Sequence, residues 1–278
     1  MKFDGRGFAQ KIEEQVKNKV RNFVGKPHVV SILVGDDPAS HLYTKLKKQA
    51  AERVGIEFEV VKVSSCEGLT QIVEKVGENS QVQGMMIQLP IPSPHGETSL
   101  QGLALKEVLD AIPKEKDIDG LRYPESGIVP PVVAAILQVI NEIEKTQSSD
   151  HSSKNAQGSE LGQRKYVVVG ASGFVGSAVC SELEKMRYQV IKVDSDTQNA
   201  KELVLQGDMV ISCVGKEGVV RDDMVKKGAV VIDVGAPKGD MTKEVYQNAS
   251  ISVEVPGGIG PVTIACLMQS VVDRCRKI

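Results

Sequence analysis

Short apolar runs alternate with amphipathic stretches along this chain, and that alternation constrains its fold more than any other feature. In the first half, runs typical of strands and patterns typical of helices follow one another at residues 28–34, from Ser40, 58–63, 69–76, 84–89 and 100–112. Strands that are separated by helices normally pair in parallel through right-handed crossovers. The sequence therefore predicts an α/β fold with parallel sheets.

A second alternating series begins at Tyr166, with strands expected at 166–169, 189–193, 208–213 and 229–234. Before it, a helix is expected over 131–143. Residues 146–163 are then rich in Ser, Gln, Asn, Gly and Asp. Such a segment buries too little apolar surface to order itself, so we expect a flexible linker or loop insertion. Residues 262–275 show an amphipathic helix with no strand of its own to follow, which we expect to pack back on the first domain.

Composition excludes several classes of protein. Of 278 residues, 41% are hydrophobic and 25% charged, which is typical of soluble globular proteins, and a net charge of −2 offers no basic surface for nucleic acid or an anionic membrane. The sequence contains neither a long apolar run that predicts a membrane span nor an N-terminal secretory signal, so we expect a cytoplasmic protein. The five scattered cysteines lack a CxxC pair, which favours free thiols over metal ligation.

Tyr43 and Lys47 form the first candidate site. They lie four residues apart in the helix expected from Ser40, so they share one helix face close to the carboxyl end of a strand. Open α/β sheets bind their ligands at that edge. A flat aromatic ring beside a titratable amine suits a planar substrate that needs a proton moved.

A glycine-rich turn joins the strand that begins the second series to a helix. Its small residues Gly170, Ser172, Gly173 and Gly176 let the backbone approach a pyrophosphate, and the helix N-terminus supplies N–H donors. The next strand ends in Asp194, 24 residues after Gly170, where a carboxylate can accept hydrogen bonds from a ribose hydroxyl of NAD. Asp194 could equally be a solvated turn residue. The turn as a whole predicts a dinucleotide site.

A second glycine-rich loop precedes the last helix. Residues 256–261 contain three glycines and two prolines. Proline fixes φ and glycine permits positive φ, so this loop has a defined shape. Taken alone, it is as consistent with a hinge as with a binding loop.

Several segments together carry a resemblance to a known family. They are Pro38–Lys47, Gly84–Pro92 around Gln88, Lys116–Gly120, Val168–Gly176, Val214–Lys216, Val231–Gly235 and Pro256–Thr263. In this order they resemble the bifunctional methylenetetrahydrofolate dehydrogenase/methenyltetrahydrofolate cyclohydrolase (FolD) family. The resemblance implies an enzyme that oxidises 5,10-methylenetetrahydrofolate with NAD(P)+ and hydrolyses the 5,10-methenyl product to 10-formyltetrahydrofolate. It also implies a homodimer.

The resemblance implies a role for each residue of the first site. Lys47 acts in the cyclohydrolase step, Tyr43 lines the pterin and aminobenzoyl region, Gln88 holds and tunes the lysine, and Asp119 grips the pterin. This division suits the chemistry. Adding water to the methenyl cation and opening the ring both require proton transfers. Gln88 can accept a hydrogen bond from the lysine without the negative charge that would keep the lysine protonated.

The remaining implied assignments concern the loops and the domains. The residues expected to border the folate are Pro256, Gly257, Gly258 and Thr263, and those expected to join the glycine turn in binding the cofactor are Val214 and Gly215. The expected domains are a folate-binding catalytic domain over 1–140 plus 256–278, the linker or insertion at 146–163, and a Rossmann NAD(P)-binding domain over 164–255. The resemblance implies no metal.

Two departures from the family pattern bear on the cofactor and the substrate loop. After Gly176 the family usually has Arg-Pro, whereas this chain has Ser177-Ala178, and carboxylates stand around Asp194 where the family places readers of the NADP 2′-phosphate. A carboxylate repels a phosphate, so the sequence favours NAD over NADP. The segment after Asp119 is also shorter than usual and carries Pro130 where the family has threonine.

Three alternatives stay open at this level. The chain could be a family member in which the cyclohydrolase dominates because cofactor binding is impaired. It could also be a different small-substrate dehydrogenase of the shikimate type, or a folate- or dinucleotide-binding protein without turnover. Loss of methenyl-folate in a spectroscopic assay separates the catalytic readings from the last one.

Overall fold

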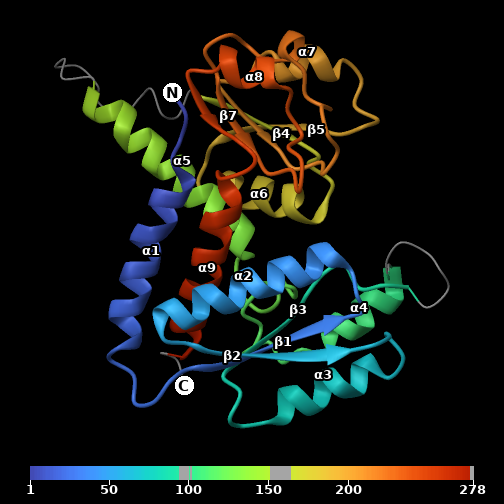
Figure 1. The fold of residues 1–278 in the computed structure, drawn as a ribbon. Coiled ribbons are helices and arrows are strands. Elements are labelled where there is room, and N and C mark those ends of the chain that lie inside the picture. The colour runs from blue at the N-terminus through green and yellow to red at the C-terminus, as the bar shows by residue number, and fades with distance from the viewer. Residues whose placement is uncertain (94–99, 101, 151–163, 276–278) are drawn as a thin grey trace. The chain divides into compact units, whose positions relative to one another are not determined.

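Two parallel sheets, each covered by helices, make up the computed structural model of this chain (Figure 1), which describes residues 1–93, 100, 102–150 and 164–275. Its contacts divide the chain into two compact units. Unit 1 consists of Met1–Phe8 and Val132–Thr263, and unit 2 consists of Ala9–Pro131 and Ile264–Ile278. The unit boundaries differ from the expected domain limits because they fall within long helices. One helix can therefore contribute residues to both units, and nearly all of the helix that begins at residue 131 belongs to unit 1. The domain limits stay a prediction.

Unit 2 is built on a three-stranded parallel sheet. Its strands are β1 (His28–Val34), β2 (Glu57–Val63) and β3 (Gly84–Ile87), in the order β2-β1-β3. Its helices include α2 (Pro38–Val54), α3 (Leu69–Glu78) and α4 (Gly102–Asp110). On one face of the central strand, Val30 and Ile32 pack with Val73 of α3 in an apolar core. The predicted strand and helix order is confirmed.

The start of α2 corrects one detail of the sequence analysis. The helix begins at Pro38 instead of Ser40, because the Asp37 side chain is the N-cap and accepts a hydrogen bond from the Ser40 backbone N–H at 2.7 Å. Proline at the first helical position lacks only an N–H that would have no helical partner there. The earlier start leaves Tyr43 and Lys47 on the same helix.

Unit 1 contains a five-stranded parallel sheet. Its strands are β4 (Lys165–Val169), β5 (Gln189–Val193), β6 (Met209–Ser212), β7 (Val230–Asp233) and β8 (Ile251–Val253), in the order β5-β4-β6-β7-β8. The shorter elements between them are α6 (Phe174–Lys185), α7 (Ala200–Val204), the 3-10 turn η2 (Asp222–Met224) and α8 (Lys243–Asn248). The strand order reverses direction at β4. Such a switch point is where open α/β sheets bind ligands.

Strand β8 corrects the expectation that the last helix follows no strand. It pairs with β7, with Ile251 opposite Val230, and helix α9 (Ile259–Cys275) follows it. A three-residue strand is too short to show a periodic pattern in the sequence. The expectation that this helix packs on the first domain is confirmed, because α9 from Ile264 onward groups with unit 2.

One helix extends past its expected end, and another lies before the first strand. Helix α5 (Pro131–Asp150) continues past residue 143 and takes in the first residues of the expected linker. Thr146 and Ser148 fit this helix because their hydroxyls donate to the backbone carbonyls of Glu142 and Glu144, at 2.9 and 2.8 Å. The rest of the expected linker, 151–163, lies outside the described residues. Helix α1 (Gly5–Val20) opens the chain.

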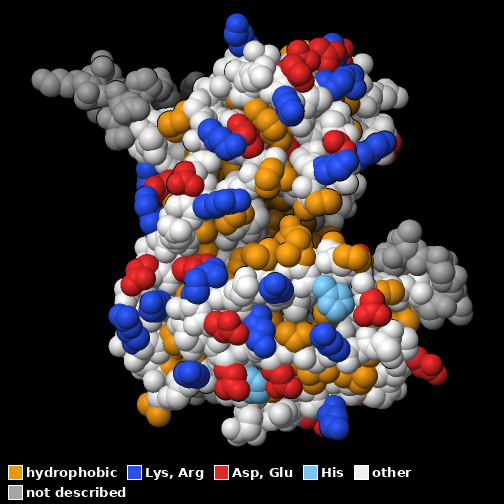
Figure 2. Space-filling view, in the orientation of Figure 1, with side chains coloured by type: hydrophobic (Ala, Val, Ile, Leu, Met, Phe, Trp, Pro, Cys, Tyr) orange, Lys and Arg blue, Asp and Glu red, His pale blue; other side chains and the backbone are white. Residues whose placement is uncertain are grey.

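The surface and the cysteines agree with the composition. Acidic and basic side chains are interspersed on the face shown in Figure 2. Among the described residues, no helix is long and apolar enough to cross a membrane, and no cluster of three or more His, Cys, Asp or Glu has the arrangement of a metal site. The cysteines are free thiols.

Candidate active site

Lys47 lies on the buried face of α2 and is only 8% exposed. Its Nζ donates a hydrogen bond to Gln88 Oε1 at 3.0 Å and lies 3.6 Å from Asp119 Oδ2. The Met86 sulfur is 3.8 Å from the same nitrogen. Tyr43 lies one helical turn earlier and is partly exposed. The structure therefore brings Lys47, Gln88 and Asp119 into contact, with Tyr43 on the same helix.

The position of Gln88 follows from the sheet. Gln88 comes directly after β3, and its backbone N–H donates to the carbonyl of Ile32 in β1 at 2.8 Å, so the parallel pairing continues one residue past the strand. Its side-chain Nε2 donates to the Leu89 carbonyl at 2.7 Å. Since the amide nitrogen has this acceptor, the amide oxygen is the atom that faces Lys47. The sheet therefore fixes the position of the oxygen that accepts a hydrogen bond from the Lys47 amine.

A short segment that pairs with β3 brings Asp119 to the Lys47 amine. The Met85 N–H donates to the Lys116 carbonyl at 2.7 Å, and the Ile118 N–H donates to the Met85 carbonyl at 3.3 Å. The carboxyl ends of parallel strands meet at one edge of a sheet. Asp119 and Gln88 follow neighbouring parallel segments, which explains why both reach Lys47.

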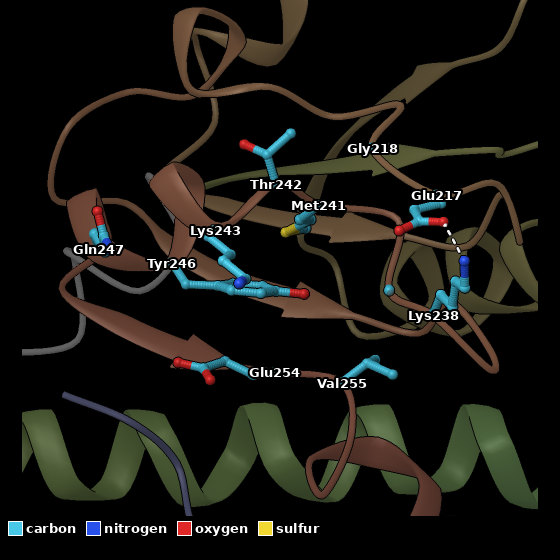
Figure 3. Close-up of a pocket in the computed structure, with 11 residues that line it drawn as sticks. Glu217, Gly218, Lys238, Met241, Thr242, Lys243, Tyr246, Gln247, Glu254 and Val255 are labelled. Atoms are coloured by element: carbon cyan, nitrogen blue, oxygen red, sulfur yellow. Dashed lines mark ion pairs between the residues drawn. The ribbon is translucent and has the colours of Figure 1, made fainter.

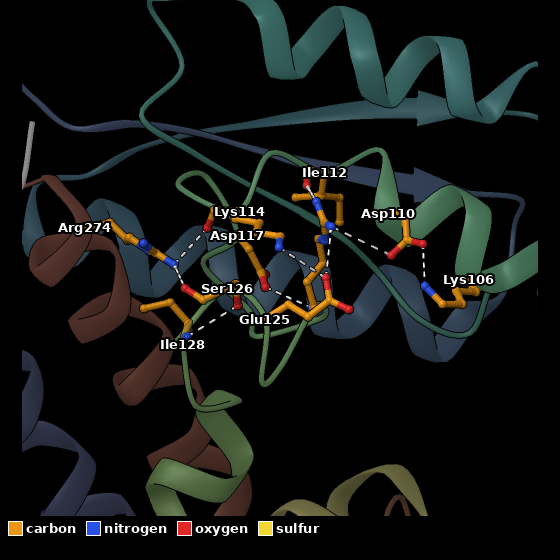
Figure 4. A network of polar contacts seen from close by, with 10 residues as sticks. Lys106, Asp110, Ile112, Lys114, Asp117, Glu125, Ser126, Ile128 and Arg274 are labelled. Carbon is orange, nitrogen blue, oxygen red and sulfur yellow. Dashed lines mark hydrogen bonds and ion pairs between the residues drawn. The ribbon is translucent and has the colours of Figure 1, made fainter.

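A second carboxylate holds the turn that carries Asp119. Asp117 is fully buried, and its two oxygens accept hydrogen bonds from the backbone N–H groups of Leu121 and Arg122 at 3.1 and 3.0 Å. Arg122 in turn donates to the Ile112 carbonyl at 2.6 Å. These contacts belong to the polar network in Figure 4. They fix the backbone on both sides of Asp119.

The last helix supports the same segment from a distant part of the chain. Arg274 of α9 donates from one nitrogen to the carbonyls of Lys114 and Ser126, at 2.8 and 2.6 Å (Figure 4). These two carbonyls flank the turn that contains Asp119. Neither supporting role, that of Asp117 or that of Arg274, was predicted from the sequence. The paired aspartates at 117 and 119 were visible as a motif, whereas nothing in the sequence indicates the partner of Arg274.

Burial has the largest electrostatic effect on the carboxyl beside Lys47. Burial raises the pKa of the Asp119 carboxyl, the Lys47 ammonium opposes this, and the negative charge of Asp117 adds to it. From the sequence, Asp119 was expected to contact only the substrate, and Gln88 was expected to contact the amine. The structure adds that Asp119 also faces the amine, so the lysine has one neutral and one anionic neighbour.

The glycine turn of unit 1 has the close packing that a dinucleotide turn requires. Gly170 has a φ of +82°, and a Cβ there would lie 2.9 Å from the Cys213 carbonyl oxygen. A Cβ on Gly176 would lie 2.0 Å from the Gly170 carbonyl oxygen. Gly173 is the N-cap of α6 and offers no side-chain cap, so the first N–H groups of the helix are left for an anion. These features fit a pyrophosphate.

Asp194 lies at this turn. Its Oδ1 accepts hydrogen bonds from the backbone N–H and the hydroxyl of Ser172, at 2.9 and 2.8 Å. Val214, after β6, lies against Gly170, because its Cγ2 would be 3.1 Å from a Cβ on that glycine. The structure therefore groups the predicted cofactor residues, with Gly215 next along the chain, at the switch point between β4 and β6.

The second glycine loop belongs to unit 1 up to Thr263, whereas Lys47, Gln88 and Asp119 belong to unit 2. The loop turns sharply after Pro256. The Gly258 N–H donates to the Glu254 carbonyl at 2.9 Å, and a Cβ on Gly258 would lie 2.6 Å from that oxygen. Gly257 has a φ of +104°. The Thr263 hydroxyl is used within α9, where it donates to the Ile259 carbonyl at 3.1 Å.

A separate pocket of about 620 Å³ opens in unit 1 (Figure 3). Its lining includes Tyr246, Met241 and the ion pair of Lys238 with Glu217, whose Nζ and Oε2 are 3.1 Å apart. None of the predicted catalytic, folate or cofactor residues lines it. Its walls carry charges of both signs, so charge alone selects no ligand for it.

Comparisons with known proteins match the chain over nearly its whole length. A model described as the tetrahydrofolate dehydrogenase/cyclohydrolase catalytic domain matches residues 3–119, and one described as the NAD(P)-binding domain of the same enzymes matches residues 153–278. The bifunctional protein FolD of Methanosarcina mazei is 32% identical over 296 residues, which cover 99% of this chain and 96% of that protein.

Solved structures agree with these matches. The bifunctional enzyme FolD, a methylenetetrahydrofolate dehydrogenase/cyclohydrolase from Campylobacter jejuni, has a TM-score of 0.84 at 26% identity, covering 100% of this chain and 99% of that chain. The methylenetetrahydrofolate dehydrogenase-cyclohydrolase of Trypanosoma brucei, solved with NADP cofactor and an inhibitor, has a TM-score of 0.81 at 27% identity. It covers 100% of this chain and 97% of its own.

Proposed function

This chain belongs to the tetrahydrofolate dehydrogenase/cyclohydrolase family, and on that premise we propose which of its residues carry each reaction. The protein is a bifunctional enzyme of one-carbon metabolism. It oxidises 5,10-methylenetetrahydrofolate to the 5,10-methenyl form with NAD(P)+ and hydrolyses that product to 10-formyltetrahydrofolate. A shikimate-type dehydrogenase and a binding protein without turnover are not favoured by these matches.

The cyclohydrolase step is assigned to Lys47. The Lys47–Gln88 hydrogen bond at 3.0 Å is the observation that carries the assignment, because it holds a buried amine at the edge of a sheet where substrates bind. The amine takes one proton from the water that attacks the methenyl carbon, and it returns that proton to the ring nitrogen when the carbon–nitrogen bond breaks. The remaining hydroxyl proton leaves to solvent as the formyl carbonyl forms. Gln88 orients the amine, and Tyr43 lies beside the pterin.

Asp119 is assigned to the pterin. A carboxylate can accept paired N–H bonds from the amino-pyrimidinone edge of a pterin. The loop with Pro256, Gly257, Gly258 and Thr263 borders the rest of the folate. This assignment gives Asp119 two partners, since its Oδ2 also lies 3.6 Å from the Lys47 amine.

The dehydrogenase step needs positioning more than a strong base. The nicotinamide cofactor, when bound, supplies the hydride acceptor. The turn of Gly170, Ser172, Gly173 and Gly176 would hold its pyrophosphate at the N-terminus of α6. The loop after β6, with Val214 and Gly215, forms the neighbouring wall.

The preferred cofactor is NAD. Asp194 supports this proposal, because its carboxylate is held at the glycine turn by Ser172 at 2.8–2.9 Å, where it would repel a 2′-phosphate and accept from a 2′-hydroxyl. Steady-state kinetics with both cofactors test the proposal, and a higher kcat/KM with NADP+ would overturn it. Turnover with neither cofactor while hydrolysis persists would identify a cyclohydrolase with impaired cofactor binding.

The assignment of Lys47 is tested by Lys47→Met, which keeps an apolar stem of similar length. Hydrolysis of the methenyl form, followed by the loss of its absorbance, should fall by at least 100-fold, the lower end of what a positioned acid–base group contributes, which is about 10²–10⁴-fold. Folate binding measured by calorimetry should persist. Lys48→Met, on the exposed side of the same helix, is the matched control and should hydrolyse at the wild-type rate. Full activity of Lys47→Met would remove the lysine from the mechanism.

We also propose that the enzyme is a cytoplasmic homodimer, on the family resemblance alone. Light scattering coupled to size-exclusion chromatography tests the dimer, and a monomeric mass at micromolar concentration would contradict it.

A further inference from the structure

We propose that Asp240 is a positioning residue for the nicotinamide cofactor, because its buried carboxylate sets the backbone of the loop 214–216. The inference rests on the proposed function, in which that loop forms part of the cofactor site. Asp240 itself is 0% exposed, so it acts on the cofactor only through the loop. No signal in the sequence distinguishes it from the other aspartates.

The loop is attached to the Asp240 carboxylate at two points. One oxygen, Oδ2, accepts from the Val214 N–H at 2.7 Å and also from the Ser212 hydroxyl at 2.8 Å. The other oxygen, Oδ1, accepts from the Lys216 N–H at 2.9 Å. Ser212 is the last residue of β6, so the carboxylate joins the end of the strand to the loop that follows it.

A second buried carboxylate fixes Asp240 in turn. Asp233, the last residue of β7, accepts the Asp240 N–H at 2.9 Å and the Met241 N–H at 2.8 Å. It also accepts the hydroxyl of Tyr246 at 2.7 Å. A Cβ on Gly235 would lie 2.4 Å from Asp240 Oδ1, so only glycine leaves the carboxylate its place there. The two aspartates therefore form a rigid polar link from β7 to the loop after β6.

Residues 214–216 are exposed, so their own side chains do little to hold the loop. Gly215 adopts a φ of +73° and contributes no side chain, and the Val214 side chain is 39% exposed. Val214 lies against Gly170 of the glycine turn. If the two N–H groups lose their acceptor, the loop is free to move over the turn that binds the cofactor. The two N–H bonds to this carboxylate are partly buried, and a hydrogen bond to a charged acceptor contributes more to stability than one between neutral groups.

Asp240→Asn tests the proposal, because it keeps the shape of the side chain but turns one acceptor oxygen into an NH2 group that faces an N–H donor. Calorimetric binding of NADH and NADPH should weaken by about tenfold or more for the cofactor that the wild type prefers, and the dehydrogenase KM for the oxidised cofactor should rise by a similar factor. Hydrolysis of the methenyl form, assayed without cofactor, should stay within twofold of the wild type. A variant that had lost only overall stability would show no such split between the two activities.

Ser212→Ala is the matched control, because it removes a donor to the same Asp240 oxygen while both loop N–H groups keep their acceptor. Its cofactor affinity should stay within twofold of the wild type. Equal weakening in both variants, or unchanged affinity in Asp240→Asn, would overturn the proposal. A wild type that binds no cofactor would instead contradict the proposed function.

Amide hydrogen exchange of the wild type gives a test that does not depend on the folding of any variant. The N–H groups of Val214 and Lys216 should exchange much more slowly than that of Gly218, which lies two residues beyond the held part of the loop. Rapid exchange at 214 and 216 would show that the carboxylate does not hold them.

Discussion

Replacing Asp119 by asparagine should weaken binding of the methenyl substrate. The substitution keeps the shape of the side chain and one oxygen that can accept from the pterin. It removes the negative charge, which also lies 3.6 Å from the Lys47 amine. Hydrogen bonds to a charged acceptor are roughly twice as strong as those between neutral groups, so asparagine should hold the pterin edge less tightly.

The size of the effect follows from the paired N–H bonds that the proposed function gives to the carboxylate. In the variant, one N–H loses its acceptor and the other donates to a neutral oxygen. A hydrogen bond to a charged group contributes about 1.5–3 kcal/mol, and about 1.4 kcal/mol corresponds to a factor of ten. KM for methenyl-folate should therefore rise by roughly 10- to 100-fold.

The measurement is KM for methenyl-folate hydrolysis, followed by absorbance across the pH range. Because burial raises the pKa of Asp119, the difference between variant and wild type should shrink at acidic pH, where the wild-type carboxyl is protonated as well. Asp110→Asn, which removes a surface carboxylate paired with Lys106, should leave KM unchanged. A wild-type KM in Asp119→Asn, or a difference that persists unchanged at acidic pH, would refute the reasoning.

Two further substitutions test the supports of the sites. Arg274→Gln removes the charged donor to the carbonyls of Lys114 and Ser126, of which the first bond is exposed and the second partly buried. A hydrogen bond to a charged group contributes about 1.5–3 kcal/mol and the exposed bond should contribute little, so the free energy of unfolding in urea should fall by about 2 kcal/mol and KM for folate should rise. Unchanged values for both would show that Arg274 does not support this segment. Gly176→Ala places a Cβ 2.0 Å from the Gly170 carbonyl oxygen, so NADH binding should be lost in calorimetry, whereas Gly260→Ala, where a Cβ meets nothing within 4 Å, should bind normally.

The sequence was most informative where local periodicity decides the structure. The long strand His28–Val34 was predicted at its observed limits, because a buried parallel strand is a continuous apolar run. The strand Ile251–Val253 was missed, since three residues carry no period. The end of α5 was missed for a different reason. Its last turns are polar, and side-chain bonds such as that of Thr146 to its own helix cannot be read from composition.

In the candidate sites, too, the residues predicted correctly are those whose spacing along the chain is regular. Tyr43 and Lys47 were placed on one face by their spacing, and the glycines of the turn were recognised by their spacing after a strand. Apart from Gln88, the residues that hold these groups in place were not recognised. Asp240 accepts from backbone N–H groups 26 and 24 residues away, and these become its neighbours only when the sheet has formed. Asp117 accepts from N–H groups four and five residues ahead, a local turn that its position in the sequence does not reveal.

Tyr43 and Lys47 lie on one helix, α2, but differ in their exposure to solvent. Tyr43 is partly open to solvent, whereas Lys47, one turn later, is buried and donates to Gln88, which directly follows strand β3. The turn of α2 that carries Tyr43 can therefore be varied to suit another planar ligand without disturbing the buried amine of Lys47. An engineer who wished to broaden the substrate range of this scaffold would begin at position 43 and leave the turn of Lys47 untouched.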